Sequence, residues 1–194
     1  MKKIVSFVLV ILALSAMLVS CGGHTVTNKA EITIEGYGTI KAELYGKDAP
    51  ITVMNFVELA KSGYYDGTQI VRVQDGFVIQ TGRGKGTSTI RGEFLINGTN
   101  NPISHERGVL SMARSTAYNS ASDQFFICLD DESAKTLDGY YASFGKVVEG
   151  LDIVDKIAAD IKEAGDDAFL PDQAEAGFLA DAYKITITSI KITK

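Results

Sequence analysis

The chain has 194 residues, 45% of them hydrophobic and 22% charged, which is enough length and apolar content for one domain with a substantial core. Without its first twenty residues, which hold two lysines and no acid, it has 17 Lys and Arg against 24 Asp and Glu, a net charge of −7. This acidic balance argues against nucleic acid as a partner, since phosphate backbones need a basic face, and against adhesion to anionic lipid by charge alone.

Residues 1–20 have the pattern of an export signal. Lys2 and Lys3 precede the apolar stretch IVSFVLVILALSAMLVS (4–20), which is short and lacks a positive stop-transfer flank, and this favours a secretory signal over a permanent span. The stretch runs into Cys21, and LVSC resembles a bacterial lipobox, whose cysteine is diacylated and becomes the mature N-terminus. We therefore expect 1–20 to be a lipoprotein signal peptide and Cys21 a lipid anchor at the extracytoplasmic face of the cell membrane. The alternative is that Cys21 merely ends a plain signal sequence or a membrane anchor.

Cysteine use indicates a domain stabilised by its core rather than by disulfides. If Cys21 is acylated, only Cys128 remains, and its place in QFFICL predicts a small buried hydrophobe. Residues 22–29, GGHTVTNK, are polar and suit a short flexible tether after Cys21. Fully stretched, eight residues reach about 26 to 29 Å, so the folded domain, 30–194, is expected to stay near the membrane surface.

The first half of the domain predicts two hairpins separated by a helix. Two alternating runs around GYG, from residue 31 to 45, indicate a hairpin, and residues 48–63 form an amphipathic helix with Pro50 near its first turn. TQIVRVQDGFVIQTG (68–82) reads as a second hairpin around Asp75-Gly76. Arg72 stands within its first apolar run. A buried arginine needs partners, so taken alone Arg72 is expected on the solvent face of a strand.

The second half continues with short strand-like runs: GEFLI (92–96), GVLSMAR (108–114), DQFFICL (123–129) and YASFGKVV (141–148). EGLDIVDKIAADI (149–161) predicts a second amphipathic helix, residues 160–180 have no clean period and predict an irregular excursion, and AYKITITSIKI (182–192) closes the chain as a strand. Many short strands with two helices indicate a closed antiparallel β-structure with helical plugs.

The chain has few of the motifs and residues that are typical of catalytic or metal-binding sites. The Gly-rich run 82–89 lacks the spacing of a phosphate-binding loop. The histidines are His24, in the tether, and His105; the G-x-S-x-G elbow of a serine hydrolase is absent. One usable histidine and one core cysteine make a zinc site implausible, and Asp130-Asp131 reads as solvated surface because adjacent residues usually point apart. We expect no metal and no cofactor.

Five blocks nevertheless resemble, in order and spacing, the signature blocks of the cyclophilins. They are APITVMNFVELAKSGYYDGT (49–68), IVRVQDGFVIQTG (70–82), GVLSMAR (108–114), NSASDQFFICL (119–129) and LDGYYASFGKVVEGLDIVDKI (137–157). The match spans roughly residues 30 to 160, and the final strand also fits. The resemblance implies a mainly β fold, a closed eight-stranded antiparallel barrel capped by two α-helices, and peptidyl-prolyl cis-trans isomerase activity in a monomer.

The resemblance also carries over to single residues. Arg72 falls at the catalytic arginine. The residues at substrate-binding positions are Phe77, Gln80, Met112, Ala113, Gln124, Phe126, Leu137 and Tyr141. An apolar pocket the size of a proline ring is expected from Phe77, Met112, Phe126 and Leu137, beside Arg72. Gln80 would orient Arg72 or the substrate carbonyl, and Gln124 with the backbone near Ala113 would hold the peptide.

Three positions depart from the family pattern. Thr136 stands where many members have a tryptophan that lines the groove and supports cyclosporin binding, Tyr141 where a histidine is common, and Arg114 where an asparagine often lies. All three belong to the rim, so they affect inhibitor and sequence preference more than catalysis.

The expected substrates are proline-containing segments of exported proteins. An X-Pro amide rotates over a barrier near 20 kcal/mol. In the twisted transition state the nitrogen lone pair becomes an acceptor, which an always-charged guanidinium can stabilise. The alternatives are a non-catalytic module that grips proline-bearing segments and a tethered structural lipoprotein that acts through its surface. Arg72 beside Gln80 favours the enzyme, because gripping needs only the pocket.

Overall fold

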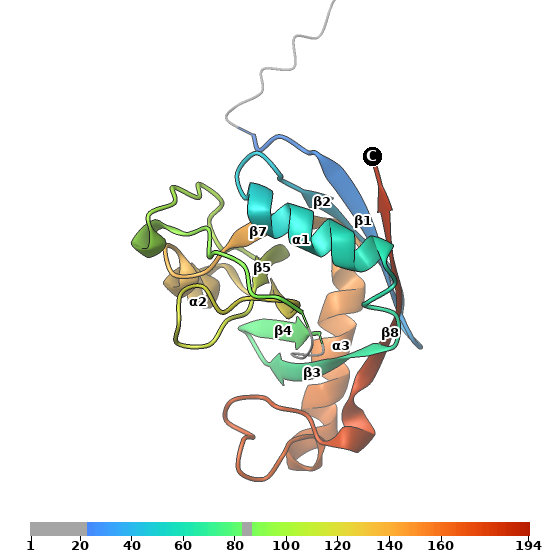
Figure 1. Ribbon diagram of the computed structural model, residues 1–194. Coiled ribbons are helices and arrows are strands. Elements are labelled where there is room, and N and C mark those ends of the chain that lie inside the picture. The colour runs from blue at the N-terminus through green and yellow to red at the C-terminus, as the bar shows by residue number, and fades with distance from the viewer. Residues whose placement is uncertain (1–22, 83–86) are drawn as a thin grey trace, which may run out of the picture.

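The computed structural model describes residues 23–82 and 87–194, in which eight strands close into one antiparallel barrel (Figure 1). The strand order is β1-β2-β7-β5-β6-β4-β3-β8. This confirms the predicted mainly β, eight-stranded barrel. The predicted signal peptide 1–20 and Cys21 lie outside the described residues. The strands are β1 (Asn28–Ile34), β2 (Gly38–Leu44), β3 (Thr68–Gln74), β4 (Val78–Thr81), β5 (Val109–Met112), β6 (Phe125–Cys128), β7 (Ser143–Glu149) and β8 (Ile185–Thr193).

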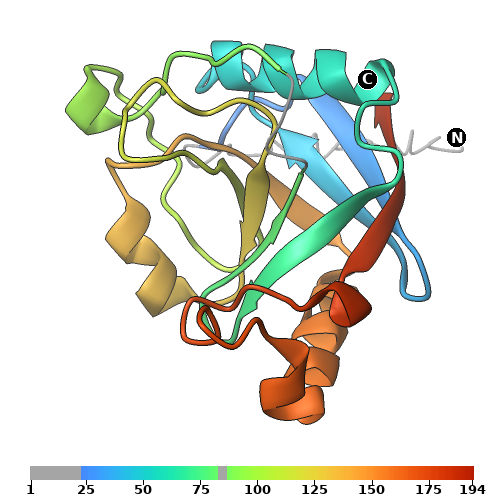
Figure 2. The same cartoon turned by 60° about the horizontal axis from the view of Figure 1, so that its bottom comes forward.

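Two α-helices cover the barrel from opposite sides, as Figure 2 shows. α1 (Pro50–Lys61) has Pro50 at its start and buries Val53 and Phe56 against the core; α3 (Leu151–Ala164) follows Gly150 and buries Val154 and Ile157. Both helices match the predicted amphipathic segments. Shorter turns complete the chain: α2 (Asp131–Ala134) and the 3-10 turns η1 (Leu95–Asn97), η2 (Lys135–Leu137), η3 (Gly165–Ala168) and η4 (Asp181–Tyr183). In the described part of the chain no helix is both long and apolar enough to span a membrane.

The barrel has two hydrophobic clusters, one inside and one outside, because alternate side chains of a strand point to opposite faces. On β5, β6 and β4 the inward residues include Leu110, Met112, Phe125, Ile127 and Ile79. Their outward neighbours on the same strands form a second, smaller cluster, which we call the outer cluster: Val78, Val109, Phe126 and Cys128, with Tyr45, Ile103 and Ala134. Cys128 is fully buried there and burial raises the pKa of its thiol to about 12, which confirms the buried role predicted for it.

The predicted strand GEFLI (92–96) is wrong. Phe94 is buried, but Leu95 and Ile96 are exposed in the turn η1. The physical reason lies at Glu93, whose side chain turns away to the start of α1, so the segment runs across the molecule instead of pairing with a strand.

The predicted flexible tether 22–29 is held against the barrel from residue 24 onward. The Nδ1 atom of His24 lies 2.9 Å from the Oδ2 atom of Asp48, and the His24 ring contacts Tyr45. The backbone N–H of Thr27 donates to Leu44 at 2.9 Å, and β1 already begins at Asn28. The side chains of His24 and Thr27 are hydrogen-bonded to Asp48 and Gly46 of the β2–α1 loop, which the composition of the segment alone did not show.

The predicted excursion is shorter than expected at its start, because α3 runs on to Ala164. The segment between α3 and β8, residues 165–184, is called the C-terminal excursion below; Figure 1 shows it beside β3. Its backbone joins the edge of β3: the N–H of Val73 donates to Gly177 at 2.8 Å and the N–H of Leu179 donates to Val71 at 2.9 Å. The excursion therefore extends the sheet next to Arg72.

Glu93 completes the start of α1. The residue before this helix, Ala49, offers no side-chain cap. Glu93 is 3% exposed; its Oε1 accepts from the backbone N–H of Ile51 at 3.1 Å, and its Oε2 accepts from the N–H and hydroxyl of Thr52 at 2.8 and 2.7 Å. A buried carboxylate at this end of a helix satisfies free N–H donors and interacts favourably with the helix dipole.

Replacing Glu93 by glutamine should therefore destabilise the fold by about 1 to 3 kcal/mol, because charged hydrogen bonds are lost and an amide N–H₂ is turned toward donors. Urea unfolding measures the change. Glu58→Gln, on the exposed face of the same helix, removes the same charge and serves as the control. Equal stability of the two variants would show that Glu93 does not act as a cap.

Candidate active site

A cleft of about 530 Å³ opens on the outer face of the barrel. The strands β3, β4 and β6 supply its floor, and the segments after β5 and before β7 supply its walls. It is lined by Arg72, Phe77, Val78, Gln80, Ala113, Arg114, Ser115, Ser120, Ser122, Gln124, Phe126, Leu137, Tyr141 and Phe178. This set joins polar donors and acceptors to an apolar patch, as small-ligand and peptide sites commonly do.

Strand register brings the predicted residues into one row. Arg72 on β3 is paired with Gln80 on β4, and Gln80 is paired with Phe126 on β6. Paired residues of neighbouring strands project to the same face, so the guanidinium, the amide and the aromatic ring meet outside the barrel. Of the residues predicted for the site, Arg72 and seven of the eight at substrate-binding positions line the cleft.

Met112 is the one predicted pocket residue that does not line the cleft. It is 1% exposed and belongs to the inner cluster, opposite Phe125. The reason is the alternation along β5: Ser111 points outward and Met112 inward. The apolar part of the cleft is instead formed by Phe126 of the outer cluster and by Phe77, Leu137 and Tyr141, which pack on that cluster.

Arg72 is half-buried and hydrogen-bonded to three other residues. Its Nε–H donates to the backbone carbonyl of Ala176 at 2.6 Å, one Nη donates to the Oε1 atom of Gln74, and the other lies 3.4 Å from the Oε1 atom of Gln80. Gln80 in turn donates from Nε2 to the Oε1 atom of Gln124 at 2.9 Å. A guanidinium has five N–H donors, so two of them have no acceptor among the described residues.

Burial lowers the pKa of Arg72, yet an arginine remains protonated in proteins. Its charge lies between two aromatic rings: the Cζ atom is 5.9 Å from the centroid of Phe77 and 5.7 Å from that of Phe178. The site thus holds a permanent positive charge beside an apolar pocket. Solvation by water is partly replaced there by fixed acceptors and ring faces.

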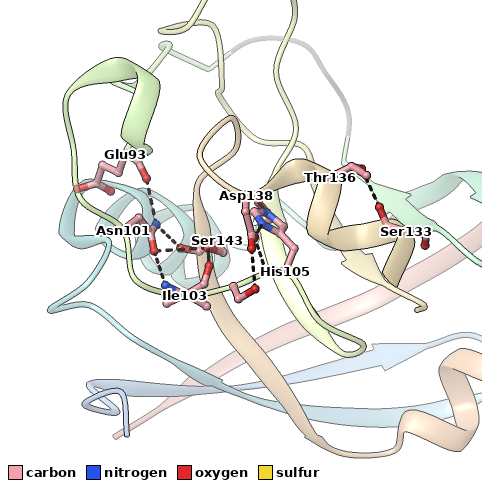
Figure 3. Close-up of polar contacts among 10 residues, drawn as sticks. Glu93, Asn101, Ile103, His105, Ser133, Thr136, Asp138 and Ser143 are labelled. Carbon is pink, nitrogen blue, oxygen red and sulfur yellow. Dashed lines mark hydrogen bonds and ion pairs between the residues drawn. The ribbon is translucent and has the colours of Figure 1, made fainter. Parts of the chain in front are cut away.

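The wall that carries Leu137 is fixed by a buried histidine (Figure 3). The Oδ1 atom of Asp138 accepts from the backbone N–H of His105 at 2.6 Å and lies 2.7 Å from its Nδ1, while Oδ2 accepts from the hydroxyl of Ser104. On its other side, the Nε2 atom of His105 lies 2.9 Å from the hydroxyl of Ser111. Burial lowers the pKa of His105, although Asp138 opposes this shift, so the ring is neutral at pH 7.

The line Asp138–His105–Ser111 has the order of a hydrolase triad but cannot act as one. Ser111 is fully buried under Phe126, and His105 is 1% exposed. A nucleophile must reach its substrate, so these groups form a structural bridge from β5 to the wall beside Leu137. The adjoining loop is fixed in the same way, because Asn101 donates to the carbonyls of Glu93 and Ser143 at 3.0 and 2.8 Å (Figure 3).

Residues 29–174 match the family described as cyclophilin type peptidyl-prolyl cis-trans isomerase/CLD. The chain belongs to this family. Its relatives include the peptidyl-prolyl cis-trans isomerase of Acinetobacter baylyi, 37% identical over 158 residues, an alignment that covers 77% of the chain and 81% of that protein. Peptidyl-prolyl cis-trans isomerase B of Escherichia coli is 38% identical over 133 residues, 62% of the chain and 79% of that protein.

Solved structures give the same result. A cyclophilin type peptidyl-prolyl cis-trans isomerase of Cryptosporidium parvum matches 86% of the chain and 98% of its own length, with a TM-score of 0.68 and 27% identity. The same protein solved in the presence of the dipeptide Ala-Pro matches with a TM-score of 0.67. The predicted cyclophilin family and isomerase class are therefore confirmed.

The sequence analysis missed five lining residues of the cleft, Val78, Ser115, Ser120, Ser122 and Phe178, and the Ala176 carbonyl that accepts from Arg72. Ala176 and Phe178 lie in the C-terminal excursion, after residue 174, where the match to the family model ends. The available signal was the aromatic residue that directly follows Gly177.

The rim of this cyclophilin site is shaped by Arg114 and Thr136. The Arg114 guanidinium lies over the Tyr141 ring, 4.6 Å from its centroid, and near Phe94 and Tyr118. Arg114 and Tyr141, two of the departures from the family pattern, therefore pack on each other. Thr136 is exposed, and its hydroxyl donates to the Ser133 carbonyl at 2.7 Å (Figure 3). It is not among the residues that line the cleft.

Thr136→Trp should strengthen cyclosporin binding roughly thirtyfold, the effect of about 2 kcal/mol from one aromatic anchor. The indole would add a flat apolar wall and an N–H donor next to Leu137, while isomerisation of a short peptide should change little. Titration with cyclosporin measures both proteins. Thr188→Trp, exposed on β8, controls for an added surface ring. Tight binding by the parent protein would show that Thr136 leaves no anchor missing.

Proposed function

We propose that this isomerase acts on X-Pro bonds of exported polypeptides at a membrane surface, with Arg72 as the catalytic residue. The observation that carries the catalytic part is the half-buried Arg72 guanidinium, with two N–H donors that have no acceptor among the described residues, beside the apolar side chains of the cleft. The Ala-Pro dipeptide present with the Cryptosporidium relative supports proline-bearing peptides as substrates.

The proposed mechanism is differential stabilisation of a twisted amide. Conjugation of the nitrogen lone pair with the carbonyl gives X-Pro rotation a barrier near 20 kcal/mol. When the bond twists, the lone pair localises on nitrogen and can accept a hydrogen bond. A fixed guanidinium donates to it in the twisted state and not in either planar state, so only the barrier is lowered. No proton is transferred and no covalent bond is made or broken.

The surrounding residues would hold the substrate in position for this step. Phe77, Phe126, Leu137 and Tyr141 would enclose the proline ring. Gln80 contacts both Arg72 and Gln124. These side-chain contacts would connect the Arg72 guanidinium to the part of the groove that holds the peptide backbone. Because these groups are already fixed by hydrogen bonds, little reorganisation is needed when substrate binds.

Arg72→Ala should lower kcat/KM on an X-Pro peptide roughly a hundredfold, as loss of a transition-state donor does elsewhere. Arg72→Lys should also be poor, because a compact ammonium cannot reproduce the guanidinium fork. Exchange NMR of a short peptide measures the rate, since uncatalysed exchange takes tens of seconds or more.

Arg91→Ala, which removes the same charge from an exposed position, should retain the parental rate. If Arg72→Ala kept the parental rate as well, the catalytic role of Arg72 would be refuted. The remaining explanation of the site would be that it binds proline-containing segments without catalysis by Arg72.

The proposed location rests on the sequence of the N-terminal region. Lys2-Lys3, the apolar run 4–20 and the abrupt polar segment after Cys21 support cleavage and diacylation at that cysteine. Two acyl chains anchor a protein stably, whereas one binds only marginally. Because His24 is held by Asp48, only about three residues, or roughly 10 Å, would separate the lipid from the barrel.

This short connection would orient the domain. The start of β1 lies at one end of the barrel, and the β3–β4 hairpin with the C-terminal excursion lies toward the other (Figure 1). A membrane at the first end would leave the groove facing the aqueous side, where unfolded exported chains are.

Cys21→Ser should abolish lipid attachment and the cleavage that depends on it, and should move the protein out of the membrane fraction. Intact-mass spectrometry of the purified protein measures lipid attachment and cleavage, and fractionation measures the location. Cys128→Ser is the matched control, because its sulfur is buried and should carry no lipid. An unmodified mature N-terminus at any residue other than Cys21 would contradict the proposal.

A further inference from the structure

We propose that Phe178, together with the backbone carbonyl of Ala176, is part of the active site: it positions Arg72 and sets a preference for a bulky apolar residue beside the substrate proline. The first half rests on the catalytic role proposed for Arg72. Phe178 itself is a positioning and specificity-determining residue, because it acts on the reacting bond only through Arg72.

Backbone pairing fixes Phe178 in place. Its neighbours Gly177 and Leu179 are bonded to Val73 and Val71 of β3 at 2.8 and 2.9 Å, and its own carbonyl accepts from the N–H of Leu170 at 2.9 Å. Leu179 is fully buried. Since side chains alternate along an extended segment, burying Leu179 turns Phe178 the other way, to the cleft, where it is one of the lining residues.

Gly177 permits this close approach to β3. Its φ is +79°, and a Cβ atom at this position would lie 2.5 Å from the carbonyl oxygen of Val73. Only glycine takes such a conformation so near another backbone without strain. The segment is therefore built to lie against the strand that carries Arg72.

The contacts with Arg72 restrict its orientation. The carbonyl of Ala176 accepts the Nε–H at 2.6 Å, and the charged group lies between the rings of Phe77 and Phe178. The Nε–H bond fixes the plane of the fork from one side, and Gln74 and Gln80 fix it from the other. An arginine side chain is long and flexible, so each fixed contact raises the fraction of time its free donors point into the groove.

The ring also enlarges the apolar surface of the groove. Phe178 is only half-buried and borders the cleft on the side of Arg72, away from Gln124 and Ser122. A substrate chain with its proline in the pocket would bring a flanking residue over this ring, where an aromatic or branched aliphatic side chain gains most contact area. The match to the family model ends at residue 174, so Phe178 lies outside the part of the chain that this model describes.

The test is a double-mutant cycle on the full-length protein, with kcat and KM measured for peptides that carry alanine or phenylalanine on either side of proline. Phe178→Ala should lower kcat about threefold on every peptide, the effect of one partly exposed cation–π contact. In the Arg72→Ala background the same change should leave kcat unaltered. KM should rise only for peptides with a phenylalanine on one flank.

Two further variants separate the two roles. Phe178→Leu keeps apolar area without an aromatic face, so kcat should fall while KM for the phenylalanine peptide stays close to the parental value. Tyr37→Ala removes a half-buried ring from the remote β1–β2 turn and should leave kcat and KM unchanged.

Each adverse result has a distinct meaning. An equal loss of kcat from Phe178→Ala in both backgrounds would show a general structural effect and refute the positioning role. A gain in kcat would show that Phe178 obstructs the groove, and an unchanged KM for all peptides would refute the preference. If Arg72→Ala alone leaves kcat unchanged, the catalytic role proposed for Arg72 is refuted. If Arg72→Ala lowers kcat strongly while Phe178→Ala changes neither kcat nor KM, only the role inferred for Phe178 is refuted.

Discussion

Alternation of side chains around a closed barrel determines where each group of this active site can lie. Every strand sends one set of residues inside and the other outside, and a shift of the register by one residue would exchange the two sets. Gln80 and Phe126 are outward and paired, whereas Met112 and Phe125 are inward and paired. The pocket is therefore built on the outside of the barrel, over its own small cluster.

A half-buried charge on that outer face requires acceptors, and the architecture around Arg72 follows from this need. The acceptors come from three parts of the chain: Gln74 on the same strand, Gln80 on the next, and Ala176 from 104 residues away. Desolvation lowers the pKa of the guanidinium, but fixed dipoles keep the charge in place. A guanidinium that is held in this way and still has free N–H donors is suited to stabilise the charge distribution of a transition state.

Local patterns in the sequence were sufficient for the hairpins, both long helices and, through five ordered blocks, the barrel and most of the cleft. They failed where long-range contacts outweigh local preference. GEFLI has the composition of a strand, but Glu93 is drawn to the start of α1; the polar residues 24–29 pair with the β2–α1 loop. The alternation of side chains along β5 could have predicted that Met112 points inward. The Ala176 carbonyl could not have been predicted, because every residue has a backbone carbonyl and the sequence does not show which one accepts a hydrogen bond.

The separation of the two clusters has a consequence for divergence within such a fold. The inner cluster closes the barrel, and the outer cluster, with Val78, Phe126 and Cys128, supports the groove. Since neighbouring positions on one strand serve different clusters, selection can act on odd and even positions independently. In a barrel of this kind the outward residues that line the groove can therefore change one at a time while the inward residues that close the barrel stay in place.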